Sequence, residues 1–153
     1  MKIVELLRED LILPELPSAA KPDVLRELSG FLSDRHEGLD REDVLRVLSE
    51  REGLSSTAVG EGIAIPHGKL DSARQLCACL ARARKGIEWG AIDGRRIHFF
   101  FVLIAPREAT GTHLKALARI SLLFKDAPFR ARLLSAETAH DMHRILSGRD
   151  AEY

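Results

Sequence analysis

Cysteine is scarce in this chain, which has only Cys77 and Cys79 among its 153 residues. Two cysteines are too few for a disulfide framework, and a C-x-C pair without further cysteines or a well-placed histidine is a weak sign of a metal or redox site. Because the two residues are separated by one position in an apolar run, they are expected on one face of a strand. We therefore predict buried structural thiols.

Neither sign of charge is in excess, since 23 basic residues balance 23 acidic ones. The chain therefore has no overall field to attract nucleic acid, an anionic membrane or a strongly acidic substrate. No apolar run approaches the roughly 20 residues of a membrane span. The start, MKIVELLRED, has acidic residues where a signal peptide would stay apolar. We predict a cytoplasmic protein with no membrane insertion and no nucleic-acid partner.

The length and the hydrophobic content predict one domain with a core of its own. The chain has 153 residues, 45% of them hydrophobic, which suits one compact unit better than two. We predict a single domain over 1–153, with a core at about 11–147 and a loose tail at 148–153, after a last helix that Gly148 ends.

Hydrophobic periodicity predicts helices that alternate with strands. Apolar residues spaced three and four apart indicate helices that begin near Pro22, at Asp40 as N-cap, after Pro106, at Pro128 and at Ser135 as N-cap. Continuous apolar runs indicate strands at 63–65, 76–81 and 97–104, the last of them central and buried on both faces. The alternation predicts an α/β fold with helices on both faces of a sheet.

Two further expectations concern individual side chains. The helix after Pro106 has Thr110 or Thr112 available as its N-cap. Its apolar spacing predicts a buried stripe made of Leu114, Leu117, Ala118, Ser121 and Leu122. Arg82, Arg84 and Lys85 form a small basic cluster. We expect it at a solvated strand end, because exposed charges are the normal content of turns.

The most informative stretch runs from Arg51 to Leu70 and reads REGLSSTAVGEGIAIPHGKL. Its short extended piece stops at a single histidine, His67, held between Pro66 and Gly68. Proline has no backbone N–H and glycine has no Cβ, so we expect open backbone around the imidazole. Such a position suits a side chain that exchanges a group with a second protein. The alternative is an ordinary solvated histidine in a turn.

The run R-E-x-L-S-S-T-x-V-G-E-G-I-A-I-P-H-G resembles the active-site segment of the enzyme IIA proteins of the bacterial phosphoenolpyruvate-dependent phosphotransferase system. The resemblance is to the fructose/mannitol class (EIIA type 2), particularly its nitrogen-regulatory branch. A later segment, A-P-x…-H-L-x-x-L-A, is similar to a second family segment, and the likeness spans residues 11 to 147. It implies a single-domain mixed β-sheet flanked by helices on both faces. It also implies a phosphorelay that needs no cofactor.

The resemblance implies a role for each residue of the site. His67 would be the phosphoryl acceptor, as a tele-phosphohistidine, His113 would hydrogen-bond the phosphate, and Arg51 would add positive charge. Pro66 and Gly68 would contribute to phosphate or partner binding. Two simpler interpretations stay open: Arg51 as a cation at a helix C-terminus, and His113 as an exposed residue in the first turn of a helix.

The resemblance also implies partners. The donor would be a histidine phosphocarrier protein (HPr/NPr-like), and the regulated partners would be proteins such as potassium transporters or sensor kinases. The chain would be a phosphotransferase component with no small-molecule turnover of its own. Alternatives are a stand-alone fructose/mannitol-type IIA that passes phosphate to a IIB component, or a non-enzymatic regulatory binding module.

Metal chemistry is a poorer interpretation of the histidines. A metal hydrolase built on His67 and His113 would need a third ligand, and no spacing in the sequence indicates one. His140 and His143 lie three apart on the last predicted helix. An H-x-x-H pair alone is weaker than any standard zinc pattern, so we expect two solvated helix residues and no metal.

Overall fold

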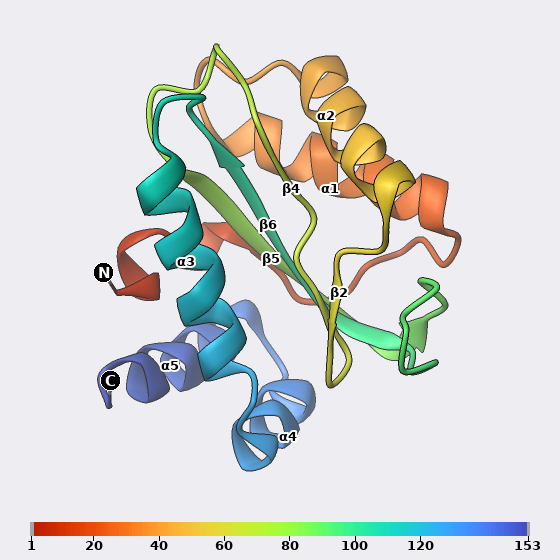
Figure 1. Ribbon diagram of the computed structural model, residues 1–153. Coiled ribbons are helices and arrows are strands. Elements are labelled where there is room, and N and C mark those ends of the chain that lie inside the picture. The colour runs from red at the N-terminus through yellow and green to blue at the C-terminus, as the bar shows by residue number, and fades with distance from the viewer. Residues whose placement is uncertain (1, 153) are drawn as a thin grey trace.

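The computed structural model describes residues 2–152, which form helices packed around one sheet (Figure 1). Its helices, with η marking a 3-10 helix, are η1 (Ile3–Glu5), η2 (Glu9–Leu11), α1 (Lys21–Arg35), α2 (Arg41–Leu54), α3 (Thr110–Leu123), α4 (Ala127–Ser135) and α5 (Ala139–Asp150). Its strands are β1 (Ile12–Leu13), β2 (Ala58–Gly60), β3 (Ile63–Ala64), β4 (His67–Lys69), β5 (Cys77–Ile87) and β6 (Ile97–Ala105). The predicted alternation of helices and strands is confirmed.

The sheet is mixed and has β6 at its centre. The strand order is β1-β5-β6-β3-β2, and β4 pairs with β6 on the same edge as β3. The β5–β6 pair is antiparallel, whereas β3 and β4 both run parallel to β6. In β6 only His98 escapes full burial, as expected of a strand covered on both faces. The central strand and the mixed sheet are therefore as predicted.

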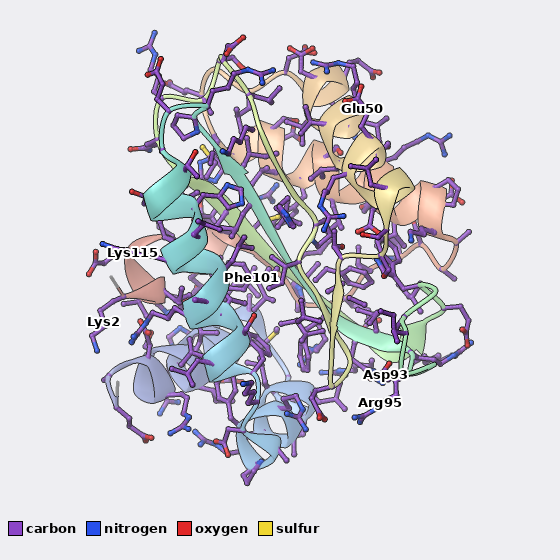
Figure 2. All side chains as sticks on the ribbon, in the orientation of Figure 1. Lys2, Glu50, Asp93, Arg95, Phe101 and Lys115 are labelled. Carbon is purple, nitrogen blue, oxygen red and sulfur yellow. The ribbon has the colours of Figure 1, made fainter. Side chains whose placement is uncertain are left out.

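Helices flank the sheet on both sides. In Figure 1 the orange and yellow helices α1 and α2 lie on one side of β5 and β6, and α3, α4 and α5 lie on the other. Figure 2 shows Phe101 of β6 among the packed side chains at the centre, with Lys115 of α3 directed outward. Phe101 is fully buried within a single hydrophobic cluster. Cys77 and Cys79 are buried in the same cluster as free thiols, as predicted.

The extended segment before His67 does not simply stop there. Ile63 and Ala64 pair with β6, the chain leaves the ladder at Ile65 and Pro66, and His67 begins β4, opposite Leu103. The expectation of open backbone around His67 is therefore wrong, because His67 is paired in the sheet. Proline has no N–H to donate to a ladder, which explains why the break falls before the histidine rather than at it.

The C-terminal helix also differs from the prediction. Its N-cap is Thr138, whose side chain accepts a bond from the N–H of Asp141, and Ser135 instead ends α4. The helix continues through Gly148 to Asp150, which is fully buried and accepts a 2.8 Å bond from Arg119 of α3. Residues 148–150 are therefore not a loose tail, because a buried carboxylate requires a fixed partner.

The buried stripe of α3 was predicted one position out of register. The helix buries His113, Ala116, Ile120 and Leu123, whereas Leu114 is 60% exposed and Leu122 is 44% exposed. The true buried stripe begins with a polar residue, His113, so the apolar spacing indicated the neighbouring face of the helix. The helix also starts at Thr110, and Ala109 is an N-cap without a side-chain bond, so the expected threonine cap is wrong.

Arg82 is buried instead of lying at a solvated strand end. It is 1% exposed because β5 runs on to Ile87 and carries it beneath the segment after α4. Its guanidinium donates to the carbonyl oxygens of Pro14, Leu133 and Ala136 at 2.9, 2.8 and 2.6 Å. Several carbonyl acceptors satisfy the donors of a buried guanidinium, so this arginine joins the β1 segment to the end of α4.

Candidate active site

His67 has a defined ring orientation. Its side chain is half-buried, and Nδ1 lies 2.6 Å from the carbonyl oxygen of Ile65. A carbonyl oxygen only accepts hydrogen bonds, so Nδ1 of the neutral ring carries the proton and Nε2 keeps a lone pair. The backbone around the ring is held as well, because Leu103 N–H donates to the Pro66 carbonyl at 3.0 Å.

The fold brings His113 next to His67, although 46 positions separate the two in the sequence. The rings pack edge to face, with centroids 5.4 Å apart and planes at 74°. His113 lies in the first turn of α3 and is only 4% exposed. Its Nδ1 is buried and has no hydrogen-bond partner among the described residues. His113 is therefore not the exposed helix-start residue of the simpler interpretation.

Burial keeps both imidazoles uncharged at neutral pH. It lowers the pKa of His67 below the ordinary 6.5, and the nearby Arg51 adds to this, while the Ile65 bond and Glu52 oppose it. It lowers the pKa of His113 to about 4, helped by His67 and Lys69. A neutral ring has a free lone pair, so at pH 7 His67 has the form that a nucleophile needs.

The two histidines line a cavity of about 560 Å³ between α2, β4 and α3. Arg51, in the last turn of α2, lines it too and donates a 2.9 Å bond to the carbonyl oxygen of Ser55. The complete lining is Val47, Glu50, Arg51, Leu54, His67, Gly68, Lys69, Thr110, His113, Leu114 and Leu117. Every predicted site residue except Pro66 thus lines this one cavity.

The chain matches a known protein family. The family model described as phosphoenolpyruvate-dependent sugar phosphotransferase system, EIIA 2, matches residues 5–148. The chain belongs to the EIIA 2 family. The match confirms the predicted family and its function as a phosphoryl-carrying component of a phosphotransferase system.

Individual relatives of this EIIA chain cover it almost completely. The nitrogen regulatory protein of Bradyrhizobium diazoefficiens is 36% identical over 147 residues, which are 96% of this chain and 95% of that protein. The fructose-specific EIIABC component of Bacillus subtilis is 35% identical over 98% of this chain but only 24% of that longer protein. The solved structure of nitrogen regulatory protein IIA-Ntr from Neisseria meningitidis has a TM-score of 0.87 and 30% identity, covering 94% of this chain and 98% of that one. The predicted fold class is confirmed.

Lys69 is a residue of this EIIA site that the sequence interpretation missed. Its ammonium group donates a 2.7 Å bond to the hydroxyl of Thr110, so it spans the cavity from β4 to the start of α3. A signal for it was present, because Lys69 follows His67 by two positions and such residues share one face of a strand. The strand was not predicted because Pro66 interrupts the extended segment just before His67.

Gly68 is required for close packing and not for a turn. Among the described residues, positive φ angles occur at other glycines, such as Gly60 and Gly62, and not at Gly68. A Cβ built on Gly68 would lie 1.9 Å from Cγ1 of Val47, far inside van der Waals contact. The absent side chain lets α2 approach β4, which places Arg51 and His67 around the same cavity.

Gly68→Ala is expected to destabilise the EIIA fold, because the added methyl group overlaps Val47. Overpacking of this kind costs about 1–3 kcal/mol, which denaturant unfolding would measure. Val47→Ala in the same chain should restore part of that loss. Gly53→Ala is the matched control, since its Cβ meets nothing within 4 Å. If Gly68→Ala were as stable as the wild type, α2 would be free to move away from β4 and make room for the methyl group.

The remaining histidines of the last helix have partners outside the cavity. His140 Nδ1 contacts a carboxylate oxygen of Glu9 at 2.6 Å, and His143 Nε2 lies 3.0 Å from the carbonyl oxygen of Leu7. His143 is partly buried and so is less solvated than expected. Over residues 2–152, no group of three or more histidine, cysteine or acidic side chains is arranged to hold a metal ion. Within the same range, no helix has the length and apolar character of a membrane span.

Proposed function

We propose that this EIIA chain takes a phosphoryl group onto Nε2 of His67 from the phosphohistidine of a histidine phosphocarrier protein. The observation that carries the proposal is the 2.6 Å bond from Nδ1 to the Ile65 carbonyl, which leaves Nε2 as the nucleophile. The Nε2–P bond forms as the donor N–P bond breaks, and the electron pair of that bond returns to the donor imidazole. Positive charge developing on the His67 ring strengthens the Nδ1–H bond to Ile65.

His113 is suited to donate a hydrogen bond to the transferred phosphate. A buried N–H without an acceptor is rare and costly, so the unpartnered Nδ1 of His113 favours the tautomer with its proton on Nε2. That Nε2–H is then available to the phosphate. In the unphosphorylated chain burial lowers the pKa of His113 to about 4, so the ring meets the incoming phosphate as a neutral donor.

Arg51 and Lys69 supply positive charge to the same cavity. Phosphoryl transfer depends mainly on positioning and on electrostatic stabilisation of the equatorial oxygens. Two cations at the cavity wall compensate for the charge that a phosphate brings, because both histidines are uncharged before the transfer. The exposed side chains of Leu54 and Leu114, 83% and 60% exposed, give the donor protein an apolar rim to contact.

The regulatory branch fits the chain better than the sugar-specific branch. The nitrogen regulatory protein is 36% identical and the IIA-Ntr structure has a TM-score of 0.87. A fructose-specific EIIA component that is matched over 90% of its own length is 32% identical, and a mannitol IIA structure has a TM-score of 0.77. We assign the chain to the nitrogen branch, with partner proteins such as potassium transporters or sensor kinases recognised according to its phosphorylation state. It then needs no turnover of a small molecule, and the cytoplasmic location stays a prediction.

A transfer experiment distinguishes the two branches. The phosphorylated chain is mixed with a fructose-type IIB domain that has been shown to accept phosphate from its own IIA. We expect the phosphate to remain on this chain, and affinity capture to retain different proteins with the phosphorylated and unphosphorylated forms. Rapid transfer to IIB would instead identify a stand-alone fructose/mannitol-type IIA. Failure of every phosphocarrier to label the chain would favour a binding module without phosphoryl transfer.

A further inference from the structure

A buried carboxylate paired with a partly exposed lysine lies next to the site. Glu52 follows Arg51 in the last turn of α2, yet its side chain is only 3% exposed. Lys21 of α1 approaches one carboxylate oxygen at 3.1 Å. Thr57 donates to the same carboxylate twice, from its N–H at 3.3 Å and from its hydroxyl. A buried carboxylate is tolerated only when it is paired and hydrogen-bonded in this way.

A continuous series of hydrogen bonds leads from this carboxylate to His67. The carbonyl oxygen of Thr57 accepts a 3.0 Å bond from Ile65 N–H, and the Ile65 carbonyl accepts the 2.6 Å bond from Nδ1 of His67. As whole residues, Glu52, Thr57 and Ile65 are all buried. Water therefore has little access to replace these bonds, and each residue in the series fixes the next.

We propose that Thr57, anchored by Glu52, is a positioning residue that holds the Ile65 carbonyl in place and so maintains the reactive tautomer of His67. This inference rests on the proposed phosphoryl transfer to His67. Pro66 has no N–H, so the peptide group that carries the Ile65 carbonyl has no donor of its own to anchor it. The Pro66 carbonyl is held by Leu103 on the following side, and the Ile65 N–H is held by Thr57 on the preceding side. The bond from Ile65 N–H to Thr57 is therefore one of the two constraints that place the Ile65 carbonyl.

The effect is one of placement. The N–H of Thr57 and its carbonyl belong to different peptide groups, so the carboxylate does not polarise the Ile65 bond through one amide. It fixes where Thr57 lies, and through Thr57 where Ile65 lies. A small displacement of the Ile65 oxygen would weaken the Nδ1–H bond, and the proton would then partly move to Nε2. That nitrogen could no longer attack phosphorus.

Thr57→Val tests this inference, because valine has the same shape and lacks the hydroxyl donor. In ¹⁵N NMR spectra of the unphosphorylated protein, we expect His67 to shift from the Nδ1–H tautomer toward a mixture with the Nε2–H tautomer. The maximal rate of phosphoryl acceptance should fall about tenfold through misplacement of the nucleophile, with unchanged half-saturation by the donor. Thr57→Ser keeps the hydroxyl donor, so it should keep the wild-type tautomer and the wild-type transfer rate. Glu52→Gln, which removes the ion pair and one bond to Thr57, should act in the same direction.

A stability control separates positioning from general loosening of the fold. Thr138→Val removes the side-chain cap of α5, which lies outside the cavity and its hydrogen-bond series. It should lower stability while leaving the His67 tautomer and the transfer rate unchanged. The inference is overturned if Thr57→Val and Glu52→Gln, like Thr138→Val, lower stability but leave the His67 tautomer and the transfer rate unchanged. If the wild type accepts no phosphate at all, the proposed function fails, and the tautomer spectra still decide this inference.

Discussion

His67→Ala is expected to abolish phosphorylation of the chain. With labelled phosphoenolpyruvate, the upstream phosphotransferase and a histidine phosphocarrier, the wild type should acquire an acid-labile, alkali-stable phosphate and the variant none. The expected effect is complete because the substitution removes the atom that bonds phosphorus. His113 cannot take over, since it is 4% exposed and its Nδ1 is buried against the protein.

His140→Ala is the matched control for that experiment. His140 is an exposed histidine of α5 that contacts Glu9 and lies outside the cavity. Its removal should leave the labelling unchanged, because it takes no part in the arrangement around His67. Labelling of His67→Ala at the wild-type level would place the phosphate on another residue and would remove the basis of the proposed function.

His113→Leu is expected to slow phosphoryl transfer by about 100-fold, the lower end of the loss seen when one donor to a developing oxyanion is removed. Leucine fills a similar volume and provides no N–H, so the folded structure should persist. Stopped reactions sampled over time give the rate, and circular dichroism reports the fold. An unchanged rate in a folded variant would exclude His113 from the site.

The same variant should be less sensitive to acid. Between pH 6.5 and about 4, His113 binds a proton in the unfolded chain and does not in the folded chain. Protonation then favours the unfolded state, so His113 should lower the free energy of unfolding of the wild type as the pH drops through that window, and its own contribution should change no further below it. His113→Leu has no such group, so its stability should fall less over the same range. Parallel pH profiles would contradict a buried neutral His113.

The sequence was sufficient for the parts of the fold that follow apolar patterning. The nine residues of β6 are apolar except for one histidine, and they form the central strand. The N-cap of α2 was also visible, because Asp40 precedes an apolar stripe and accepts a bond from Asp43 N–H. In both cases one local pattern is enough to decide the structure.

Prediction from patterning failed where a polar side chain occupies a buried position. Arg82 was assigned to solvent because its many carbonyl acceptors come from segments far away in the sequence. His113 heads the buried stripe of α3, which shifted the predicted face onto Leu114. Burial of such groups depends on partners that only the tertiary structure supplies.

The candidate site was predicted through the family resemblance and not through spacing. No local rule places His113 against His67, since β5 and β6 separate β4 from α3 in the sequence. The acceptor for the His67 ring is the carbonyl oxygen of Ile65, which no pattern in the sequence indicates. The packing role of Gly68 was not visible in the sequence, because close approach to Val47 is a property of packing between distant segments.

The measurement that tests the central claim most directly is NMR of the phosphorylated protein labelled with ¹⁵N in its histidine rings. The geometry predicts one phosphate, bonded to Nε2 of His67, with Nδ1 still protonated and hydrogen-bonded to Ile65. Coupling between phosphorus and Nε2 of that ring would establish it. A phosphate on Nδ1 of His67, or on the ring of His113, would contradict the account.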